Sequence, residues 1–370
     1  MLSRRLRRRG HDVTAVEGGQ PALELLEKEP FDLVLLDIMM PGIDGLEVLR
    51  RLRRTISAVD LPVIMATARD DSADVVGALK LGANDYVTKP LDFPVVLARV
   101  QTQLSLKKTN EALAEAHRRM KTDLDAAARF QQSLLPTVVP RTDRVDFAWR
   151  YIPCDELAGD AVNVCELGDG SYVFYLLDVS GHGVPAALLS VTATHTLSTT
   201  TGPASPFRNP VTEEPVKPAE VAGVLNGLFP MEVNDGHYFT LALGMLDSNA
   251  GRLQMITAGH PGPIVLRPGD SPRTVDLPNL PIGCWADAEF VDFELGLRPG
   301  DRLYVFSDGL IEAEKSGEEF GLDRLQVVTE AQRDLPLDDG LDAIISEVIH
   351  FQGTDVFEDD VSILAIEFKG

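Results

Sequence analysis

Along the first hundred residues, short continuous apolar runs alternate with amphipathic segments of helical spacing. The leucines within 45–53 recur every three residues, for example, which predicts a helix with one buried face. Apolar runs predict the intervening strands at 12–16, 33–36, 61–66 and 85–88. Such alternation indicates βα units, and continuous apolar strands indicate a parallel sheet that helices cover on both faces.

A long helix is expected after this region, because 94–135 contains no glycine and no proline after its first residue. Apolar side chains recur every seven residues at Leu106, Leu113, Met120, Ala127 and Leu134. This spacing predicts a helix that pairs two chains as a coiled coil. A helix packed along its own domain is the alternative, because the second stripe is mostly polar: Asn110, His117, Leu124 and Gln131.

Residues 145–370 have a different pattern, in which strand-like runs dominate and glycine-rich turns separate them. The predicted strands are 147–152, 171–178, 238–246, 253–257, 263–267, 289–295, 302–307 and 361–368. Helical spacing is found near 184–197, 218–229, 322–333 and 339–350. These runs predict an α+β domain with a large antiparallel component, so the chain is expected to be multidomain.

The net charge of this 370-residue chain changes where the pattern changes. Residues 1–136 hold 20 Lys and Arg against 19 Asp and Glu, a net charge of +1. Residues 137–370 hold 14 against 38, a net charge of −24. An acidic surface repels nucleic-acid phosphates, which argues against a DNA-binding or RNA-binding role. It favours metal cations or a basic protein partner, and solubility alone is the alternative.

The cysteines and the hydropathy of the chain indicate the cellular compartment in which the protein is expected. The three cysteines, Cys154, Cys165 and Cys284, are widely spaced, so neither a disulfide framework nor a Cys-x-x-Cys zinc site is expected. No apolar run approaches the roughly 18–20 residues that span a bilayer, and no secretory signal follows the basic N-terminus. A cytoplasmic protein without membrane contact is expected.

Three polar side chains end three of the predicted strands in the first region: Asp37, Thr67 and Lys89. The carboxyl ends of parallel strands meet at one edge of a sheet, so we expect these side chains to converge there. A carboxylate can accept a phosphoryl group, and a hydroxyl and an ammonium group can hydrogen-bond its oxygens. Each residue alone is equally compatible with a turn or a helix cap.

Residues 1–105 resemble a two-component receiver domain through the segments LVLLDIMMPGIDGLEVLRRLR, LPVIMATA and LGANDYVTKP. The resemblance implies a flavodoxin-like α/β fold, with Asp37 as the phosphoacceptor and Thr67 and Lys89 as its switch and phosphate partners. It implies Tyr86 as the rotating aromatic. It also implies a cognate histidine kinase or phosphotransfer protein as the phosphoryl donor.

Two further features of receivers bear on this region. The resemblance implies a cis bond between Lys89 and Pro90. Receivers begin with an apolar strand and an acidic pair that holds Mg²⁺ beside the phosphoacceptor, whereas this sequence begins within the first helix. We therefore expect the N-terminal truncation of a receiver that binds Mg²⁺ when intact.

Four aspartates stand out in the second region: Asp178 and Asp308 each end a predicted strand, Asp359 precedes one, and Asp160 follows Gly159. If these strand ends meet, they form an oxygen-rich site of the kind that Mg²⁺ and Mn²⁺ prefer. Two such ions could lower the pKa of a bridging water and direct it at a phosphate. For each aspartate alone, a turn or a cap is the alternative.

Residues 125–370 resemble the SpoIIE-type branch of the PPM (protein phosphatase 2C-like) serine/threonine phosphatases, which act in bacterial partner-switching systems. The segments that carry the resemblance are, in order, AARFQQSLLP, AGDAVNV, YLLDVSGHGVPAALLS, YFTLALG, TAGHPGP, LPIG, YVFSDGLIEA and EEFGLDRL. The resemblance implies a sandwich of two antiparallel sheets flanked by helices, with the metal ions at one end.

The same resemblance implies two Mn²⁺ or Mg²⁺ ions in this domain. Asp160, Asp178, Asp308 and Asp359 would supply carboxylate ligands, and Val179 would supply its carbonyl oxygen. Asp178 would bridge both ions, and Asp178 and Asp308 would be the catalytic residues of the set.

Other polar residues are given lesser roles. Asp360 and His182 would lie beside the ligands, with His182 as a candidate general acid. Asn163 stands where many relatives carry an aspartate and is not counted as a ligand, and His260 is expected to be structural. The phosphate-binding arginine of eukaryotic relatives has no obvious counterpart among Arg141, Arg144 and Arg150.

The sequence therefore predicts a receiver at 1–105, a helical linker at 106–136 and a phosphatase domain at 137–370. The main hypothesis is a receiver-regulated, metal-dependent phosphatase that acts on a phosphoserine or phosphothreonine of an anti-sigma-factor antagonist. The linker would transmit the receiver's state and form a homodimer. The alternative is a partner-switch scaffold that binds the same target without catalysis.

Overall fold

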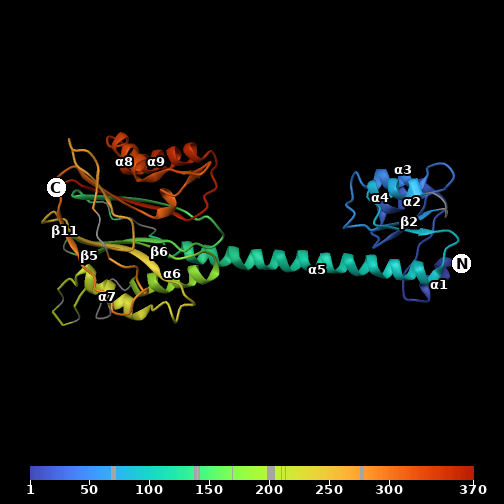
Figure 1. Ribbon diagram of the computed structural model, residues 1–370, viewed down its shortest axis with the longest axis horizontal. Coiled ribbons are helices and arrows are strands. Elements are labelled where there is room, and N and C mark those ends of the chain that lie inside the picture. Colours follow the sequence, from blue (N-terminus) through green and yellow to red (C-terminus); the bar gives the residue numbers. More distant parts are fainter. Residues whose placement is uncertain are drawn as a thin grey trace. The chain divides into compact units, whose positions relative to one another are not determined.

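The computed structural model describes residues 1–67, 72–136, 140, 142–168, 170–197, 205–209, 211–212, 214–275 and 279–370. They form two compact units, Met1–Thr122 and Asp123–Gly370, and helix α5 (Phe93–Gln132) contributes to both (Figure 1). None of the described helices combines the length and apolar character needed to cross a membrane.

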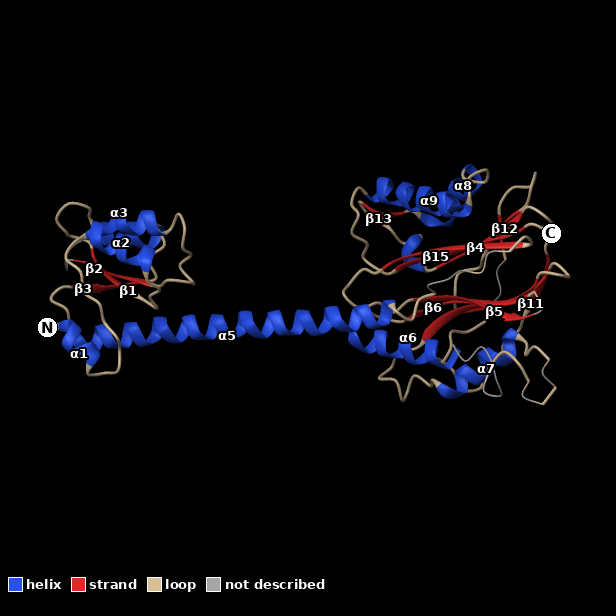
Figure 2. Cartoon of the chain, turned by 180° about the vertical axis from the view of Figure 1, so that it is seen from behind, coloured by secondary structure: helices blue, strands red, loops and turns tan. Residues whose placement is uncertain are grey.

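The first unit is built on a parallel sheet in the order β1–β2–β3. Its strands are β1 (Val34–Asp37), β2 (Val63–Thr67) and β3 (Asp85–Thr88). One face is covered by α2 (Gly19–Lys28), α3 (Gly45–Leu52) and α4 (Ser72–Lys80), and the other by α1 (Leu2–Arg7) and the start of α5 (Figure 2). An apolar core fills each face, so the predicted α/β sheet with helices on both sides is confirmed.

The strand predicted at 12–16 is absent, and this prediction is wrong. Residues 11–16 have no regular secondary structure, and the Val16 side chain is exposed. Among the described residues, β1 pairs only with β2, so no strand of this sheet lies beside residues 12–16. A strand needs a hydrogen-bonded neighbour to be stable in water, and an apolar pattern alone does not provide one.

Helix α3 follows β1 after the connecting segment 38–44. The Asp44 side chain caps this helix, because its Oδ1 accepts a hydrogen bond from the Glu47 N–H at 2.8 Å. A Cβ atom on Gly45 would lie 2.2 Å from the Asp37 carbonyl oxygen, so only glycine allows this approach. The close contact fixes the backbone that carries Asp37.

The second unit is a sandwich of two five-stranded antiparallel sheets. In spatial order, the first sheet consists of β10 (Arg273–Thr274), β9 (Ile264–Leu266), β12 (Asp301–Phe306), β15 (Val361–Phe368) and β4 (Val145–Ile152). The second consists of β11 (Phe293–Gly296), β8 (Arg252–Ala258), β7 (Phe239–Asp247), β6 (Ser171–Val179) and β5 (Ala161–Gly168). A 3₁₀ turn η1 (Asp308–Leu310) and the hairpin of β13 (Glu314–Lys315) and β14 (Glu318–Glu319) follow β12.

Helices cover the outer face of each sheet of the sandwich. Helices α8 (Gly321–Ala331) and α9 (Leu337–Gln352) cover the first sheet, and α6 (Val184–Leu197) and α7 (Pro218–Leu228) cover the second (Figure 1). One apolar core lies between the sheets, and another lies between each sheet and its helices. The predicted sandwich flanked by helices is confirmed, although the strand predicted at 289–295 is reduced to β11.

Helix α5 ends at Gln132, so the predicted helix at 94–135 is too long by three residues and Leu134 lies beyond it. The side chains of Leu106, Leu113 and Met120 are 54%, 67% and 58% exposed. The seven-residue spacing therefore leaves an apolar stripe open to solvent within each chain. Pairing of two chains through this stripe stays a prediction.

We expect Leu113→Asp combined with Met120→Asp to convert a dimer into a monomer, because each buried side chain of this size contributes about 1.5–3 kcal/mol. Light scattering at micromolar concentration measures the mass directly. Lys108→Asp with Thr122→Asp places carboxylates on the opposite face of α5 and should leave the mass unchanged. A wild-type chain that is already monomeric would show that the coiled-coil prediction is wrong.

Candidate metal centre

The candidate ligands lie where strands of the two sheets end. Asp178 is the second-last residue of β6, and Asp160 directly precedes β5. Because Ala161 pairs with Leu177, these two aspartates lie side by side. In the other sheet, Asp308 follows β12 and Asp359 precedes β15, and these strands also pair with each other. The sheet registers therefore bring the aspartates together in two pairs.

Two glycines allow the four segments to pack closely. A Cβ atom on Gly309 would lie 2.4 Å from the Asp360 carbonyl oxygen, and a Cβ atom on Gly159 would lie 2.9 Å from the Val179 carbonyl oxygen. Any side chain at these positions would push the segments apart. The dipeptides Gly159-Asp160 and Asp308-Gly309, which could each be an ordinary turn, are therefore required for close packing here.

Asp360 holds the segment that carries Asp160. The Asp360 side chain is buried, and its Oδ1 accepts a hydrogen bond from the Cys154 N–H at 2.9 Å. Its Oδ2 accepts from the Gly159 N–H at 2.7 Å and from the Asp160 N–H at 3.4 Å. Both carboxylate oxygens are thus used by the backbone, as suits a residue that lies beside the ligands and positions one of them.

Asp160 is the most deeply buried of the four candidate aspartates, and the Ser362 and Ser307 hydroxyls partly offset its charge. Its side chain is only 1% exposed, and neither carboxylate oxygen has a hydrogen-bond partner among the described residues. Burial, and then the charges of Asp178 and Asp360, raise the pKa of Asp160 well above its usual range. A buried carboxylate without a partner is costly, and a bound cation would compensate it.

Burial and neighbouring carboxylates also perturb the other ligands. Burial, followed by the charges of Asp308, Asp359 and Asp360, raises the pKa of Asp178 to about 8. Asp359 is exposed at the surface as a whole residue. Its carboxyl group is partly buried, and this burial and the charges of Asp308 and Asp360 raise its pKa. Mutual repulsion of this kind is typical of a cation site whose ligands are preformed.

The donor chemistry fits Mg²⁺ or Mn²⁺. Oxygen atoms dominate, and these hard cations prefer carboxylate and carbonyl oxygens. A group that the sequence analysis missed also lies here, because Cys154, Asp359 and Asp360 place ligand atoms within 4.8 Å of one another. Burial and then Asp360 raise the pKa of the Cys154 thiol to about 12, so it stays protonated and is a poor ligand. No motif marked Cys154 in the sequence.

The two histidines of the predicted segments differ sharply in environment. The His182 side chain is exposed, and its Nδ1 lies 3.6 Å from Asp155 Oδ2, at the surface beside the acidic cluster. His260 is buried, and its Nδ1 lies 2.7 Å from the Thr240 hydroxyl. Burial lowers the pKa of His260 to about 3, so the ring is neutral and structural. Asn163 lies in β5, where its amide donates to the Tyr175 hydroxyl at 3.3 Å.

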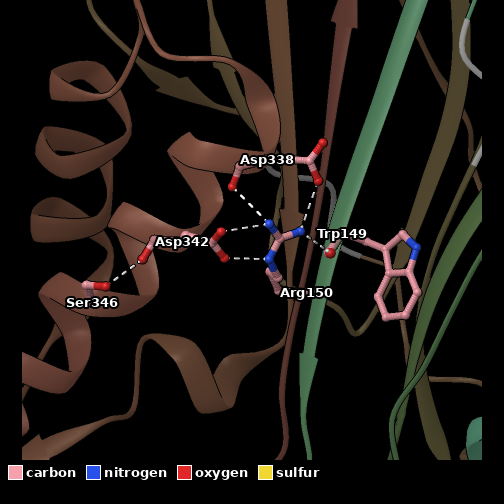
Figure 3. A network of polar contacts seen from close by, with 5 residues as sticks. All are labelled: Trp149, Arg150, Asp338, Asp342 and Ser346. Atoms are coloured by element: carbon pink, nitrogen blue, oxygen red, sulfur yellow. Dashed lines mark hydrogen bonds and ion pairs between the residues drawn. The ribbon is translucent and has the colours of Figure 1, made fainter.

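The Arg150 guanidinium contacts Asp338 and Asp342 (Figure 3). Its Nε and Nη2 donate to the two carboxylate oxygens of Asp342 at 2.6 and 3.0 Å, and its Nη1 donates to Asp338 Oδ1 at 3.1 Å. These contacts join β4 to α9, so the Arg150 guanidinium stabilises the packing of a helix and is not available to bind a phosphate. The Arg144 carbonyl accepts from the N–H of the penultimate residue, and Arg141 lies outside the described residues.

The first unit brings together its own predicted residues. Lys89 Nζ lies 2.5 Å from Asp37 Oδ2, and the Lys89 N–H donates to the Thr67 carbonyl at 2.8 Å. Thr67 is buried at the end of β2, and the Arg99 guanidinium lies 5.6 Å from the Tyr86 ring centre. The expected cis bond between Lys89 and Pro90 is present. The carboxylate, the hydroxyl and the ammonium group thus share the carboxyl edge of the sheet.

Comparisons with known sequences divide the chain in the same way. The family model described as Stage II sporulation protein E (SpoIIE) matches residues 168–369, more than half of the chain. The model of the response regulator receiver domain matches residues 1–101.

The curated relatives match the receiver region. Over 99 residues, the chain is 48% identical to transcriptional regulatory protein AfsQ1 of Streptomyces coelicolor, covering 27% of this chain and 43% of AfsQ1. Over 104 residues, it is 47% identical to the uncharacterized transcriptional regulatory protein YkoG of Bacillus subtilis, covering 28% and 45%. The chain thus spans less than half the length of the curated relatives it matches.

Solved structures resemble the second region. The SiaA-PP2C domain of Pseudomonas aeruginosa superposes with a TM-score of 0.58 at 22% identity, covering 69% of this chain and 99% of that one. The PP2C phosphatase domain of SpoIIE from Bacillus subtilis, with a fragment of its regulatory domain, gives a TM-score of 0.51 at 21% identity, covering 62% and 64%. These likenesses establish a PP2C-type fold.

The raised pKa of Asp178 predicts a stability that depends on pH in the metal-free protein. A carboxyl group whose pKa is raised on folding stabilises the fold while it is protonated. That stability is lost as the pH rises from about 4, the usual value, through the folded pKa of about 8. In EDTA, we expect Asp178→Asn to melt at least about 2–4 °C above wild type at pH 8, with a smaller difference at pH 5.

Calorimetry with Mn²⁺ completes this test. Saturation at 100 times the dissociation constant should stabilise wild type by about 2.7 kcal/mol, and should stabilise Asp178→Asn far less. Asp355→Asn, which removes an exposed carboxylate, is the matched control and should follow wild type. Equal melting of wild type and Asp178→Asn at every pH would contradict the repulsion argued here.

Proposed function

The chain belongs to the SpoIIE family, and on this premise we propose that its second unit is a metal-dependent protein serine/threonine phosphatase controlled by the receiver. The observation that carries the proposal is a chain of neighbouring carboxylates: the charges of Asp308 and Asp359 act on Asp178, and Asp178 acts on Asp160, whose buried carboxylate has no hydrogen-bond partner among the described residues. Burial and mutual repulsion make the charged form of such a cluster costly, bound cations would offset that cost, and cations at such a site are suited to phosphoester hydrolysis.

Asp160, Asp178, Asp308 and Asp359 would hold two Mn²⁺ or Mg²⁺ ions, with the Val179 carbonyl as a further ligand and Asp178 between the ions. When bound, the ions would act as Lewis acids on phosphate oxygens and supply a water of lowered pKa. The catalytic roles of Asp178 and Asp308 rest on this assignment.

Two further residues beside the centre would position a metal ligand and protonate the leaving group. Asp360 holds the backbone of Cys154, Gly159 and Asp160 through its hydrogen bonds, and so keeps one ligand in place. The exposed His182 side chain lies near Asp155, with its Nδ1 3.6 Å from Asp155 Oδ2. A protonated imidazole at this position could donate a proton to the hydroxyl group that leaves.

A phosphorylated protein suits the exposure and charge of the site. Asp359 is exposed, so a phosphorylated side chain on another protein's surface can reach the cluster. The net charge of −24 over residues 137–370 favours a partner whose surface around the phosphoryl group is basic. We propose a phosphorylated anti-sigma-factor antagonist as the substrate, in a bacterial partner-switching pathway.

The receiver would supply the input. Asp37 would accept a phosphoryl group from a cognate histidine kinase or phosphotransfer protein, with Mg²⁺ bound beside it. Its ion pair with Lys89 places an ammonium group where the phosphoryl oxygens would lie, and Thr67 and Tyr86 would respond to their charge. Helix α5 would carry this response, since it contributes to both units.

The competing proposal is a scaffold that binds the same target without catalysis, and turnover separates the two. With the full chain and Mn²⁺, we expect release of phosphate from an aryl phosphate and from a phosphoserine peptide. Asp178→Asn should lower kcat by about 100-fold or more, since losing a ligand shared by both ions removes several kcal/mol of transition-state stabilisation.

The exposed variant Asp355→Asn is again the control and should retain the wild-type rate. Activity that survives EDTA, or an Asp178→Asn protein as active as wild type, would contradict a two-cation phosphatase. Binding of the phosphopeptide without any phosphate release would support the scaffold instead.

A further inference from the structure

The last turn of α5 is bonded to the segment that carries Asp160. Gln131 Nε2 donates to the Ala158 carbonyl at 2.6 Å, and Gln131 Oε1 accepts from the Ala158 N–H at 3.2 Å. Both residues are buried, at 8% and 1% exposure. One side-chain amide therefore satisfies both polar groups of a single residue, two positions before a predicted metal ligand.

This pair of hydrogen bonds demands glutamine. A primary amide offers one donor and one acceptor at the spacing of a peptide group, which neither an apolar nor a charged side chain provides. The neighbouring Gln132 and Ser133 are exposed, so burial is specific to Gln131 within this turn. A buried Ala158 peptide without these bonds would leave two polar groups unsatisfied.

Two anchors from distant parts of the sequence therefore fix the path of the backbone into Asp160. Asp360, at the start of the final strand, binds the N–H groups of Gly159 and Asp160, and Gln131 binds both polar groups of Ala158. The Asp160 side chain contributes no hydrogen bond of its own among the described residues. The position of its carboxylate is thus set by the backbone, and the backbone is set by these two anchors.

The second anchor, Gln131, belongs to a helix that also takes part in the core of the first unit. Near its start, Val96 and Val100 belong to the apolar core of the first unit together with Val87 of β3. Near its end, Gln131 bonds to Ala158 within the second unit. One continuous helix thus takes part in the core of the first unit and in the support of the metal centre.

We propose that Gln131 is a positioning residue, which fixes Asp160 for cation binding and makes the affinity for the cation depend on the placement of the last turn of α5. The proposal deepens the proposed function, because it assigns a residue through which the receiver's state would reach the same site. Residues that orient metal ligands typically change metal affinity by about 10–100-fold when replaced.

The test compares Gln131→Leu with Gln132→Leu in the full chain. The first removes both hydrogen bonds at similar volume, and the second is a matched change at the exposed neighbour. Titration calorimetry with Mn²⁺ should show affinity at least about tenfold weaker for Gln131→Leu and unchanged for Gln132→Leu. Hydrogen exchange in the metal-free protein should be faster over residues 154–160 for Gln131→Leu alone.

Kinetics separate positioning from general damage. At saturating Mn²⁺, kcat of Gln131→Leu should return to near the wild-type value, while the Mn²⁺ concentration for half-maximal rate stays raised. If Gln131→Leu does not fold, Gln131→Glu decides, because it keeps the acceptor for the Ala158 N–H and loses the donor, while its added negative charge would by itself favour cation binding rather than weaken it. A weakened affinity in that variant supports the proposal, and an unchanged one overturns it.

Wild-type Mn²⁺ affinity and wild-type exchange in Gln131→Leu would also overturn the proposal. Failure of this proposal and failure of the proposed phosphatase activity would give different results. A wild-type protein that binds Mn²⁺ but releases no phosphate would refute catalysis, and the calorimetry and exchange of the Gln131 variants would still decide whether this residue positions the metal ligand.

Discussion

Repulsion between buried carboxylates is the constraint on which the second unit depends. Asp160 and Asp178 lie side by side at the end of paired strands, and each raises the free energy of the other's charged form. The fold tolerates this because three apolar cores and the backbone hydrogen bonds of Asp360 hold the strand ends regardless of the charge. Functional sites commonly retain such local strain, and the surrounding structure compensates for it.

Much of the fold and of the candidate site could be predicted from the sequence, because the decisive signals are local. An apolar run that stops at an aspartate marks a strand end, and this placed Asp37, Asp178 and Asp308 correctly. The prediction of a strand at 12–16 was wrong because a strand is stable only beside a hydrogen-bonded neighbour, and the local sequence pattern does not show whether that neighbour exists. Arg150 was ambiguous for a related reason, since its two carboxylate partners lie almost 200 residues further along the chain.

The polar stripe of α5 shows how one pattern can serve two purposes. Read as a coiled coil, glutamine at position 131 is a defect in the apolar seam. In the structure, this side chain is buried against Ala158, inside its own unit, so at this point the helix packs along its own domain. Leu106, Leu113 and Met120 remain exposed further towards the N-terminus. Packing along its own domain therefore describes the end of this helix, and pairing of two chains through the exposed stretch stays a prediction.

The two acidic sites of the chain balance their charge in different ways. In the receiver, the Asp37 carboxylate already has the Lys89 ammonium group at 2.5 Å, so a cation of the chain itself offsets part of its charge. In the metal centre, the strongest influences on Asp160 and Asp178 after burial are other carboxylates. Charge balance there has to come from outside the chain. We therefore expect bound cations to supply the charge balance of the second site, and any control through α5 would act on that balance.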